Sequence, residues 1–175
     1  MSAGLTLRAM RRSDVPACLR LFDGHVPGAF VPEEREEYRA FLSDPPGPVL
    51  VLCDSDGEIL AAGGVAAEKD PAVGSLCWGI VDAARQRAGL GRLLLLARVV
   101  AMFEVLGCRI ARLETLEETA GFFGSLGFET TAVRGGGHPG GRGAVEMRLE
   151  LTPDALAALR ARLDEAGLVV PRPGA

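Results

Sequence analysis

Several residue types that build active sites are scarce in this 175-residue chain. It contains one lysine, one glutamine, one tyrosine, one tryptophan, two histidines and no asparagine. Two histidines cannot form a multi-histidine metal site, and the four cysteines are scattered without a C-x-x-C pair. We therefore expect reduced thiols, no disulfide framework and no bound metal.

Long apolar runs and excess positive charge are also missing. No apolar segment reaches the roughly 18 residues that a membrane span needs, which excludes an integral membrane protein. The net charge of −4 and the pI of about 5.3 argue against a nucleic-acid-binding protein. The chain starts with polar residues and no signal peptide, so we expect a cytoplasmic protein. The preference for arginine over lysine is typical of a GC-rich bacterial genome.

What remains has the composition of a folded domain. Hydrophobic residues make up 48% of the chain, and a chain of this length can bury a core without staples. Apolar periodicity predicts strands at 5–10, 49–53, 59–67, 73–81, 109–115, 128–134 and 144–151. It predicts helices that follow Ser13, begin at Pro32, and span 90–106, about 117–126 and 155–166.

The order of these elements restricts the fold. The strand–helix–strand unit at 73–115 implies a parallel pair with a right-handed crossover. The hairpin at 49–67 and the last two strands imply antiparallel neighbours. We therefore expect an α/β protein with a mixed central β-sheet of about seven strands, flanked by helices on both faces.

The segment 81–92, which reads V-D-A-A-R-Q-R-A-G-L-G-R, lies between a strand and the longest helix. Gly89 and Gly91 let the backbone approach a ligand, and the helix start adds free N–H groups and a positive dipole. Gln86, Arg87 and Arg92 supply further donors. This pattern favours a phosphate or pyrophosphate site, although a tight strand–helix turn would also explain the two glycines. The Walker and dinucleotide-binding patterns are absent.

The stretch Q-R-A-G-L-G from Gln86 to Gly91 resembles Q/R-x-x-G-x-G/A, the acetyl-coenzyme A loop of the GCN5-related N-acetyltransferase (GNAT) superfamily. Residues 120–128 and 144–151 also resemble later segments of that family. The resemblance covers about residues 5–151. It implies a GNAT fold in which strands four and five splay apart, a single domain at 1–151, and a C-terminal helix and tail at 152–175 that pack on or extend this domain.

The resemblance also implies a function and a set of site residues. An acetyl group would pass directly from acetyl-coenzyme A to a primary amine of a small molecule or peptide. Ile80 and Val81 would pair through their backbone with the pantetheine arm, and Phe123 would pack against it. The pyrophosphate would be held by the loop residues Gln86, Arg87, Ala88, Gly89, Leu90, Gly91 and Arg92. The oligomeric state, monomer or homodimer, stays open.

The chain departs from the family at the proton-transfer groups. Phe123 occupies the place where many members have a tyrosine acid, and residues 75–78 of the fourth strand lack a carboxylate. Candidates for the base are Glu114 on the fifth strand and His138 in the glycine-rich loop 135–141. Glu114 would otherwise be solvated or paired with Arg112 or Arg109, and His138 would otherwise simply be exposed.

Two interpretations of the acceptor side and two functions therefore stay open. The acidic residues 33–37 would either attract a cationic amine or complement the start of their helix. The first function is an acetyl-coenzyme A-dependent N-acetyltransferase. The second is a GNAT-fold module that binds acyl-coenzyme A without turnover and serves as a sensor or interaction domain.

Overall fold

The computed structural model describes residues 4–138 and 141–173. The polar start of the chain (1–3), the tip of the glycine-rich loop (139–140) and the end of the tail (174–175) lie outside the described residues, as do the side chains of His138 and Arg142. In the described part of the chain, no helix has both the length and the apolar character needed to cross a membrane.

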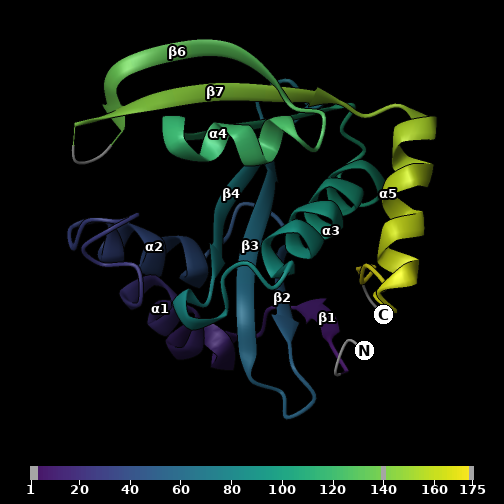
Figure 1. Ribbon diagram of the computed structural model, residues 1–175. Coiled ribbons are helices and arrows are strands. Elements are labelled where there is room, and N and C mark those ends of the chain that lie inside the picture. The colour runs from purple at the N-terminus through teal and green to yellow at the C-terminus, as the bar shows by residue number, and fades with distance from the viewer. Residues whose placement is uncertain (1–3, 139–140, 174–175) are drawn as a thin grey trace.

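The described residues form one mixed sheet of seven strands in the order β1-β2-β3-β4-β5-β7-β6 (Figure 1). The β4–β5 pair is parallel, and the other neighbours are antiparallel. This confirms the predicted α/β class and its mixed sheet. The strands are β1 (Thr6–Ala9), β2 (Val49–Cys53), β3 (Ile59–Ala67), β4 (Val73–Val81), β5 (Ile110–Leu116), β6 (Glu129–His138) and β7 (Arg142–Glu150).

Helices cover both faces of this sheet. On one side of β2–β4 lie two helices, and the long central helix and the last helix lie on the other, while a short helix lies under the β6–β7 hairpin (Figure 1). The helices are α1 (Val15–Asp23), α2 (Glu34–Ser43), α3 (Leu90–Glu104), α4 (Glu117–Gly124) and α5 (Pro153–Glu165).

The helix α3 is buried on most of its surface because it packs on the sheet and on α5. Leu94 and Ala97 belong to a core shared with β2 and β3, and Leu156 and Leu163 of α5 close that core from outside. Arg160 of α5 also forms an ion pair with Glu104 at the end of α3. The additional C-terminal helix therefore supports the element that begins at the glycine motif.

The strands β4 and β5 diverge soon after they meet. Their pairing covers only Val73–Ser75 of β4 and Ile110–Arg112 of β5. Of the remaining six residues of β4, four pair with β3 (Leu76, Cys77, Ile80 and Val81), and none pairs with β5. The predicted splay of the fourth and fifth strands is therefore present, and it leaves an open gap between their carboxyl ends.

A bulge further distorts β4 beside this gap. Ala62 of β3 lies opposite Ile80, but Gly64, two residues on, lies opposite Cys77, so β4 carries one extra residue. At the bulge Trp78 has a φ of 48°, a left-handed conformation that a bulky residue rarely adopts. Such strain is found at sites where the surrounding structure imposes it.

Two predicted helix starts are displaced toward the C-terminus. Residues Arg12–Asp14 form a 3₁₀ turn, and α1 begins only at Val15. The second helix begins at Glu34 rather than at Pro32. The carboxylate of Glu34 accepts a hydrogen bond from the Val31 N–H at 2.9 Å, which closes a turn before the helix starts.

The glycine-rich segment predicted as a loop is largely strand, so that prediction was wrong. The strand β6 extends through residues 135–138, and His138 pairs with Arg142 of β7. A register irregularity between Arg134 and His138 and a φ of 68° at Gly136 let the hairpin continue despite its glycines.

Candidate functional site

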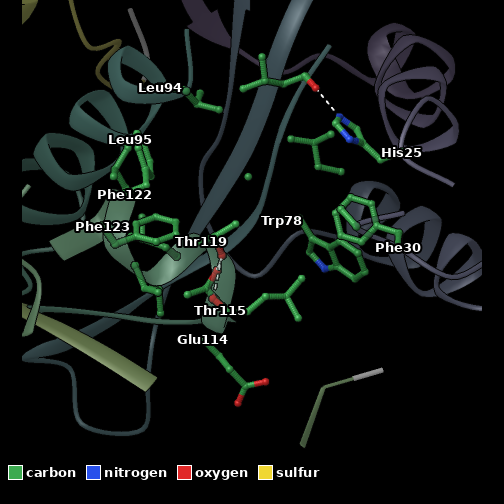
Figure 2. A pocket seen from close by; sticks show the side chains of 18 of the residues that line it. His25, Phe30, Trp78, Leu94, Leu95, Glu114, Thr115, Thr119, Phe122 and Phe123 are labelled. Atoms are coloured by element: carbon green, nitrogen blue, oxygen red, sulfur yellow. Dashed lines mark hydrogen bonds between the residues drawn. The ribbon is translucent and has the colours of Figure 1, made fainter. Parts of the chain in front are cut away.

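A cavity of about 660 Å³ occupies the gap between β4 and β5. One end lies at the glycine turn before α3, and the other lies beside α2 and the loop that precedes it. Figure 2 shows His25, Phe30 and Trp78 on one wall, facing Leu94, Leu95, Phe122 and Phe123 on the other. The splay of the sheet thus creates one continuous chamber with two chemically different ends.

The glycine-turn end is built from main-chain groups. Arg87 and Gly89 both have left-handed backbone, with φ of 66° and 80°, directly before α3 begins at Leu90. Alternating backbone conformations of this kind turn successive N–H groups toward one point, which creates an anion-binding concavity. A Cβ placed on Gly89 would meet no atom within 4 Å, so the space above the turn is open. The turn therefore fits a phosphate group.

The side chains around this turn strengthen the same preference. Gln86 and Gly91 line the cavity directly, and Arg87 and Arg92 are exposed at its mouth. Neither arginine forms an ion pair with a described residue, so both guanidinium groups are available to an anionic ligand.

The next part of the wall is the free edge of β4. The N–H of Asp82 donates to the Leu60 carbonyl on β3, so the carbonyl of Val81 points away from β3 and into the gap. There it accepts a hydrogen bond from Nε2 of His25 at 2.6 Å (Figure 2). Because a carbonyl only accepts, Nε2 carries the proton, and this bond ties the loop after α1 to the edge of β4.

The far end of the cavity is acidic and aromatic. Glu34 and Glu37 of α2 and Glu114 of β5 line it, together with the rings of Phe30 and Trp78. The two rings lie 5.9 Å apart between their centroids. Glu34 is largely buried and holds the Val31 N–H, whereas Glu37 and Glu114 are exposed. An amine cation suits this combination of carboxylates and ring faces.

A buried arginine lines the middle of the cavity. Arg98 of α3 is 5% exposed, and its guanidinium reaches the bulge in β4. Nε and Nη2 donate to the Gly64 carbonyl at 3.1 and 2.9 Å, and Nη2 also donates to the Cys77 carbonyl at 2.8 Å. No described carboxylate pairs with this charge, which is unusual because an unpaired buried charge costs several kcal/mol.

The predicted cofactor-binding residues are brought together at one end of the cavity and along its walls. Ile80, Val81, Gln86, Gly91 and Phe123 line it, and the rest of the loop from Arg87 to Arg92 surrounds its mouth. Phe123 packs edge-to-face against Phe128 with ring centroids 6.0 Å apart. This placement agrees with the predicted positions, while the roles of these residues stay predictions.

The two candidate bases have different outcomes. Glu114 lines the cavity and makes no ion pair with a described residue, because Arg112 instead pairs with Glu68 at 2.8 Å. His138 lies at the end of β6, and its side chain is outside the described residues. His25, which was not among the candidates, lines the cavity.

The interpretation of the sequence also missed Arg98 and the role of Trp78 as a cavity wall. A signal for Arg98 was available, since it follows Leu94 by four residues on the apolar stripe of α3. A charge on a buried stripe needs either a partner or a function. Among the described residues there is no group of three or more histidine, cysteine, aspartate or glutamate side chains that could hold a metal ion.

Comparisons with known proteins agree with this geometry. The family model described as the acetyltransferase (GNAT) family matches residues 16–128. A GCN5-related N-acetyltransferase from Kribbella flavida is 25% identical, with a TM-score of 0.70 over 84% of this chain and 98% of that one. A search of curated protein sequences found no match.

Two further solved structures share the fold at lower identity. The ribosomal-protein-S18-alanine N-acetyltransferase of Escherichia coli is 21% identical, with a TM-score of 0.71 over 85% of this chain and 95% of that one. A spermidine N-acetyltransferase variant from Vibrio cholerae is 17% identical, with a TM-score of 0.68 over 84% and 94%. The family match spans well over half of the sequence, and this chain belongs to the GNAT acetyltransferase family.

Proposed function

We propose that this protein is an N-acetyltransferase that moves an acetyl group from acetyl-coenzyme A directly to a primary amine of a small molecule or peptide. The observation that carries the proposal is the continuous cavity, with a main-chain anion site at one end and an acidic, aromatic site at the other. Two substrates that enter from opposite ends would meet between β4 and β5, which supplies proximity without a covalent enzyme intermediate.

Direct transfer is supported by the state of the cysteines. Burial raises the pKa of all four thiols, that of Cys18 to about 11, so none is poised as a thiolate nucleophile. None of the four lines the cavity. No cysteine is therefore placed to form an acetyl-enzyme intermediate before the acetyl group reaches the amine.

The residues present fit acetyl-coenzyme A as the acyl donor. The main chain from Arg87 to Arg92 would hold the pyrophosphate, and Ile80 and Val81 would extend the free edge of β4 to the pantetheine arm. Glu37 and Glu114 would attract the amine as a cation, and Glu114 would accept its proton. We further propose that residues 1–151 form the catalytic domain, with α5 as an addition that supports α3.

The test is a thermal melt with acetyl-coenzyme A followed by a thiol-release assay with a broad panel of amines. We expect stabilisation by the cofactor and thiol release with at least one cationic amine. Arg92→Glu should abolish the stabilisation, whereas Arg162→Glu, an equal charge reversal at an exposed position of α5, should preserve it. Stabilisation that survives Arg92→Glu would contradict the assignment of the loop.

A second function is favoured by one observation, the phenylalanine at position 123. It lines the cavity where many family members carry a tyrosine acid, so the protein would bind acyl-coenzyme A without turnover. Stabilisation by acetyl-coenzyme A without thiol release across the whole amine panel would support this binding module over the enzyme.

A further inference from the structure

Arg98 is unusual because the sheet is shaped around its guanidinium. A Cβ on Gly63 would lie 2.8 Å from Nε, and a Cβ on Gly79 would lie 2.5 Å from Nη1. Both distances are shorter than a real side chain tolerates, so the two glycines keep open the space that the arginine fills. The bulge in β4 and these glycines together leave an opening between β3 and β4, through which Arg98 reaches the cavity.

Only two of the three guanidinium nitrogen atoms of Arg98 donate hydrogen bonds to described groups. Nε and Nη2 satisfy the carbonyls of Gly64 and Cys77, which the bulge would otherwise leave without partners. Nη1 donates to no described group, although Arg98 is more than nine-tenths buried and lines the cavity. A neutral amide could satisfy two carbonyls, so the positive charge and the free Nη1 need another explanation.

The charge persists at neutral pH. Burial lowers the pKa of Arg98 to about 10, which is still well above neutrality. Nearby polar groups do not neutralise it, because burial also keeps the Cys77 thiol and the Tyr38 hydroxyl in their protonated, uncharged forms. The middle of the cavity therefore has a fixed positive charge without a counter-ion among the described residues.

The position of this charge coincides with the expected position of the reacting thioester. A pantetheine arm that starts at the glycine turn and follows the free edge of β4 passes Val81 and Ile80 before it reaches Gly79. Gly79 is the residue whose missing Cβ leaves room for Nη1. The acidic residues Glu37 and Glu114 lie at the far end of the cavity, which we call the acceptor end because the amine would enter there. The amine and Arg98 would therefore flank the thioester.

We infer that Arg98 is a catalytic residue of the acetyl transfer, with its free Nη1 directed at the thioester and its charge stabilising the oxyanion and the departing thiolate. The inference rests on the proposed function, because it requires acyl-coenzyme A in the cavity. It explains how a family member with Phe123 in place of a tyrosine can release the thiol, since a fixed charge stabilises a thiolate that no acid protonates.

The chemical step balances without any further reactant. The amine lone pair forms the C–N bond, and the π electrons of the carbonyl move to oxygen to give the oxyanion. When the C=O bond re-forms, the C–S bond breaks and sulfur leaves with the electron pair. Before the attack the ammonium loses one proton to Glu114 or water, which frees the lone pair. After the C–N bond has formed the nitrogen loses a second proton to water, and the thiolate later gains one proton from water. Arg98 stays protonated throughout.

The decisive measurement is the thiol pKa of bound coenzyme A, which needs no acceptor. The thiolate is titrated by its ultraviolet absorbance in the complex with the wild-type protein. The complex with desulfo-coenzyme A is the control, because it subtracts the four protein cysteines. We expect a thiol pKa lower than that of free coenzyme A by about 1 to 3. A bound thiol pKa equal to or above the free value would overturn the inference.

Two substitutions separate the charge from the hydrogen bonds. Arg98→Lys keeps a positive charge, and Arg98→Gln keeps a donor without charge. We expect the lowered thiol pKa to persist in the lysine variant and to be lost in the glutamine variant, with kcat reduced about 100-fold in the latter. A glutamine variant that retains both the lowered pKa and the wild-type kcat would show that Arg98 only fills the sheet.

The design also covers failed variants and distinguishes this inference from the proposed function. If a thermal melt shows that Arg98→Gln does not fold, the wild-type titration alone decides. A lowered thiol pKa without transfer to any amine supports the effect of Arg98 on sulfur and contradicts the proposed acetyl transfer. Transfer without a lowered pKa supports the proposed function and overturns the role of Arg98.

Discussion

The two ends of the cavity are built from different parts of the polypeptide. The glycine-turn end is built from the main chain of one continuous segment, shaped by the left-handed conformations of Arg87 and Gly89. The opposite, acidic end is built from side chains, with Phe30 from the loop before α2, Glu37 from α2 and Glu114 from β5. An end made of backbone tolerates many side chains and depends on conformation, whereas an end made of side chains is tuned residue by residue.

The largest expected effect is at the main-chain end. Gly89→Asp places a side chain on a residue with φ of 80° and a negative charge at the anion site. We expect acetyl-coenzyme A affinity to fall by more than about 100-fold, since two unfavourable changes of a few kcal/mol combine there. Isothermal calorimetry measures the loss.

Gly57→Asp is the matched control for this change. Gly57 has a φ of 84°, and its Cβ would also meet no atom within 4 Å, but it lies in the β2–β3 turn. Both variants therefore carry similar backbone strain. Equal loss of cofactor affinity in the two would mean that the loss comes from the fold and not from the anion site.

The next effect is at the side-chain end. Glu37→Gln combined with Glu114→Gln removes two carboxylates from the acceptor end and leaves the glycine turn intact. We expect the KM for a cationic amine to rise about five- to tenfold, with less salt dependence, and the affinity for acetyl-coenzyme A to stay unchanged. Glu36→Gln, at an exposed residue of the same helix that does not line the cavity, should change neither value. An unchanged KM in the double variant would remove the electrostatic account of acceptor binding.

A smaller effect is expected where the two ends meet. His25 donates to the Val81 carbonyl, which the pantetheine arm would also use, so the histidine would compete with the cofactor. His25→Leu should tighten acetyl-coenzyme A binding about two- to fivefold, the equivalent of one hydrogen bond, and raise the KM for the amine as the loop loosens. Weaker cofactor binding in this variant would show that His25 supports the site and does not compete for it.

A change outside the cavity should spare both ends and affect only stability. Asp14 accepts from Arg8 at 2.7 and 3.0 Å and from the Arg11 N–H at 2.7 Å. The hydrogen bond from Arg8 lowers the pKa of Asp14 below its usual value of 3.8. The stabilisation is therefore complete above the unfolded pKa and is lost as pH falls through the lower, folded pKa.

Asp14→Asn should accordingly reduce the free energy of unfolding by about 1–3 kcal/mol at neutral pH. Denaturant titrations from neutral to acidic pH should show the deficit shrinking below about pH 4, where the wild-type carboxylate is protonated in the unfolded chain. The affinity for acetyl-coenzyme A should equal that of the wild type. A deficit that does not vary with pH would mean that packing, and not charge, is lost.

The contrast between the two ends also decides what the sequence could predict. A main-chain site needs glycines at fixed positions between a strand and a helix, so Gly89 and Gly91 are visible as a motif. The mixed sheet is predicted for a similar reason, because it follows from the order of short periodic segments, whereas the splay of β4 and β5 was implied by the resemblance to the GNAT family. The parallel β4–β5 pair required only the strand–helix–strand unit.

The side-chain end could not be predicted because tertiary packing assembles it. His25 lies 56 residues from Val81, and nothing local relates the two. The glycines at 135–137 were misinterpreted because glycine favours turns on its own, whereas Arg134 and His138 on either side of them pair with β7 and so continue the hairpin. Arg98 itself is visible as a charge on the apolar stripe of α3, but its partners are backbone carbonyls, which no sequence pattern marks.

The opening between β3 and β4 that Arg98 fills also restricts which substitutions this sequence can accept during evolution. Arg98 fits only while Gly63 and Gly79 lack a side chain, and without the arginine the carbonyls of Gly64 and Cys77 lose their donors. A side chain at position 63 or 79 therefore clashes with the arginine, and a residue without a donor at position 98 leaves buried unpaired carbonyls. In a family of homologous sequences, position 98 should therefore covary with positions 63 and 79: arginine at 98 should occur together with glycine at both of the other positions.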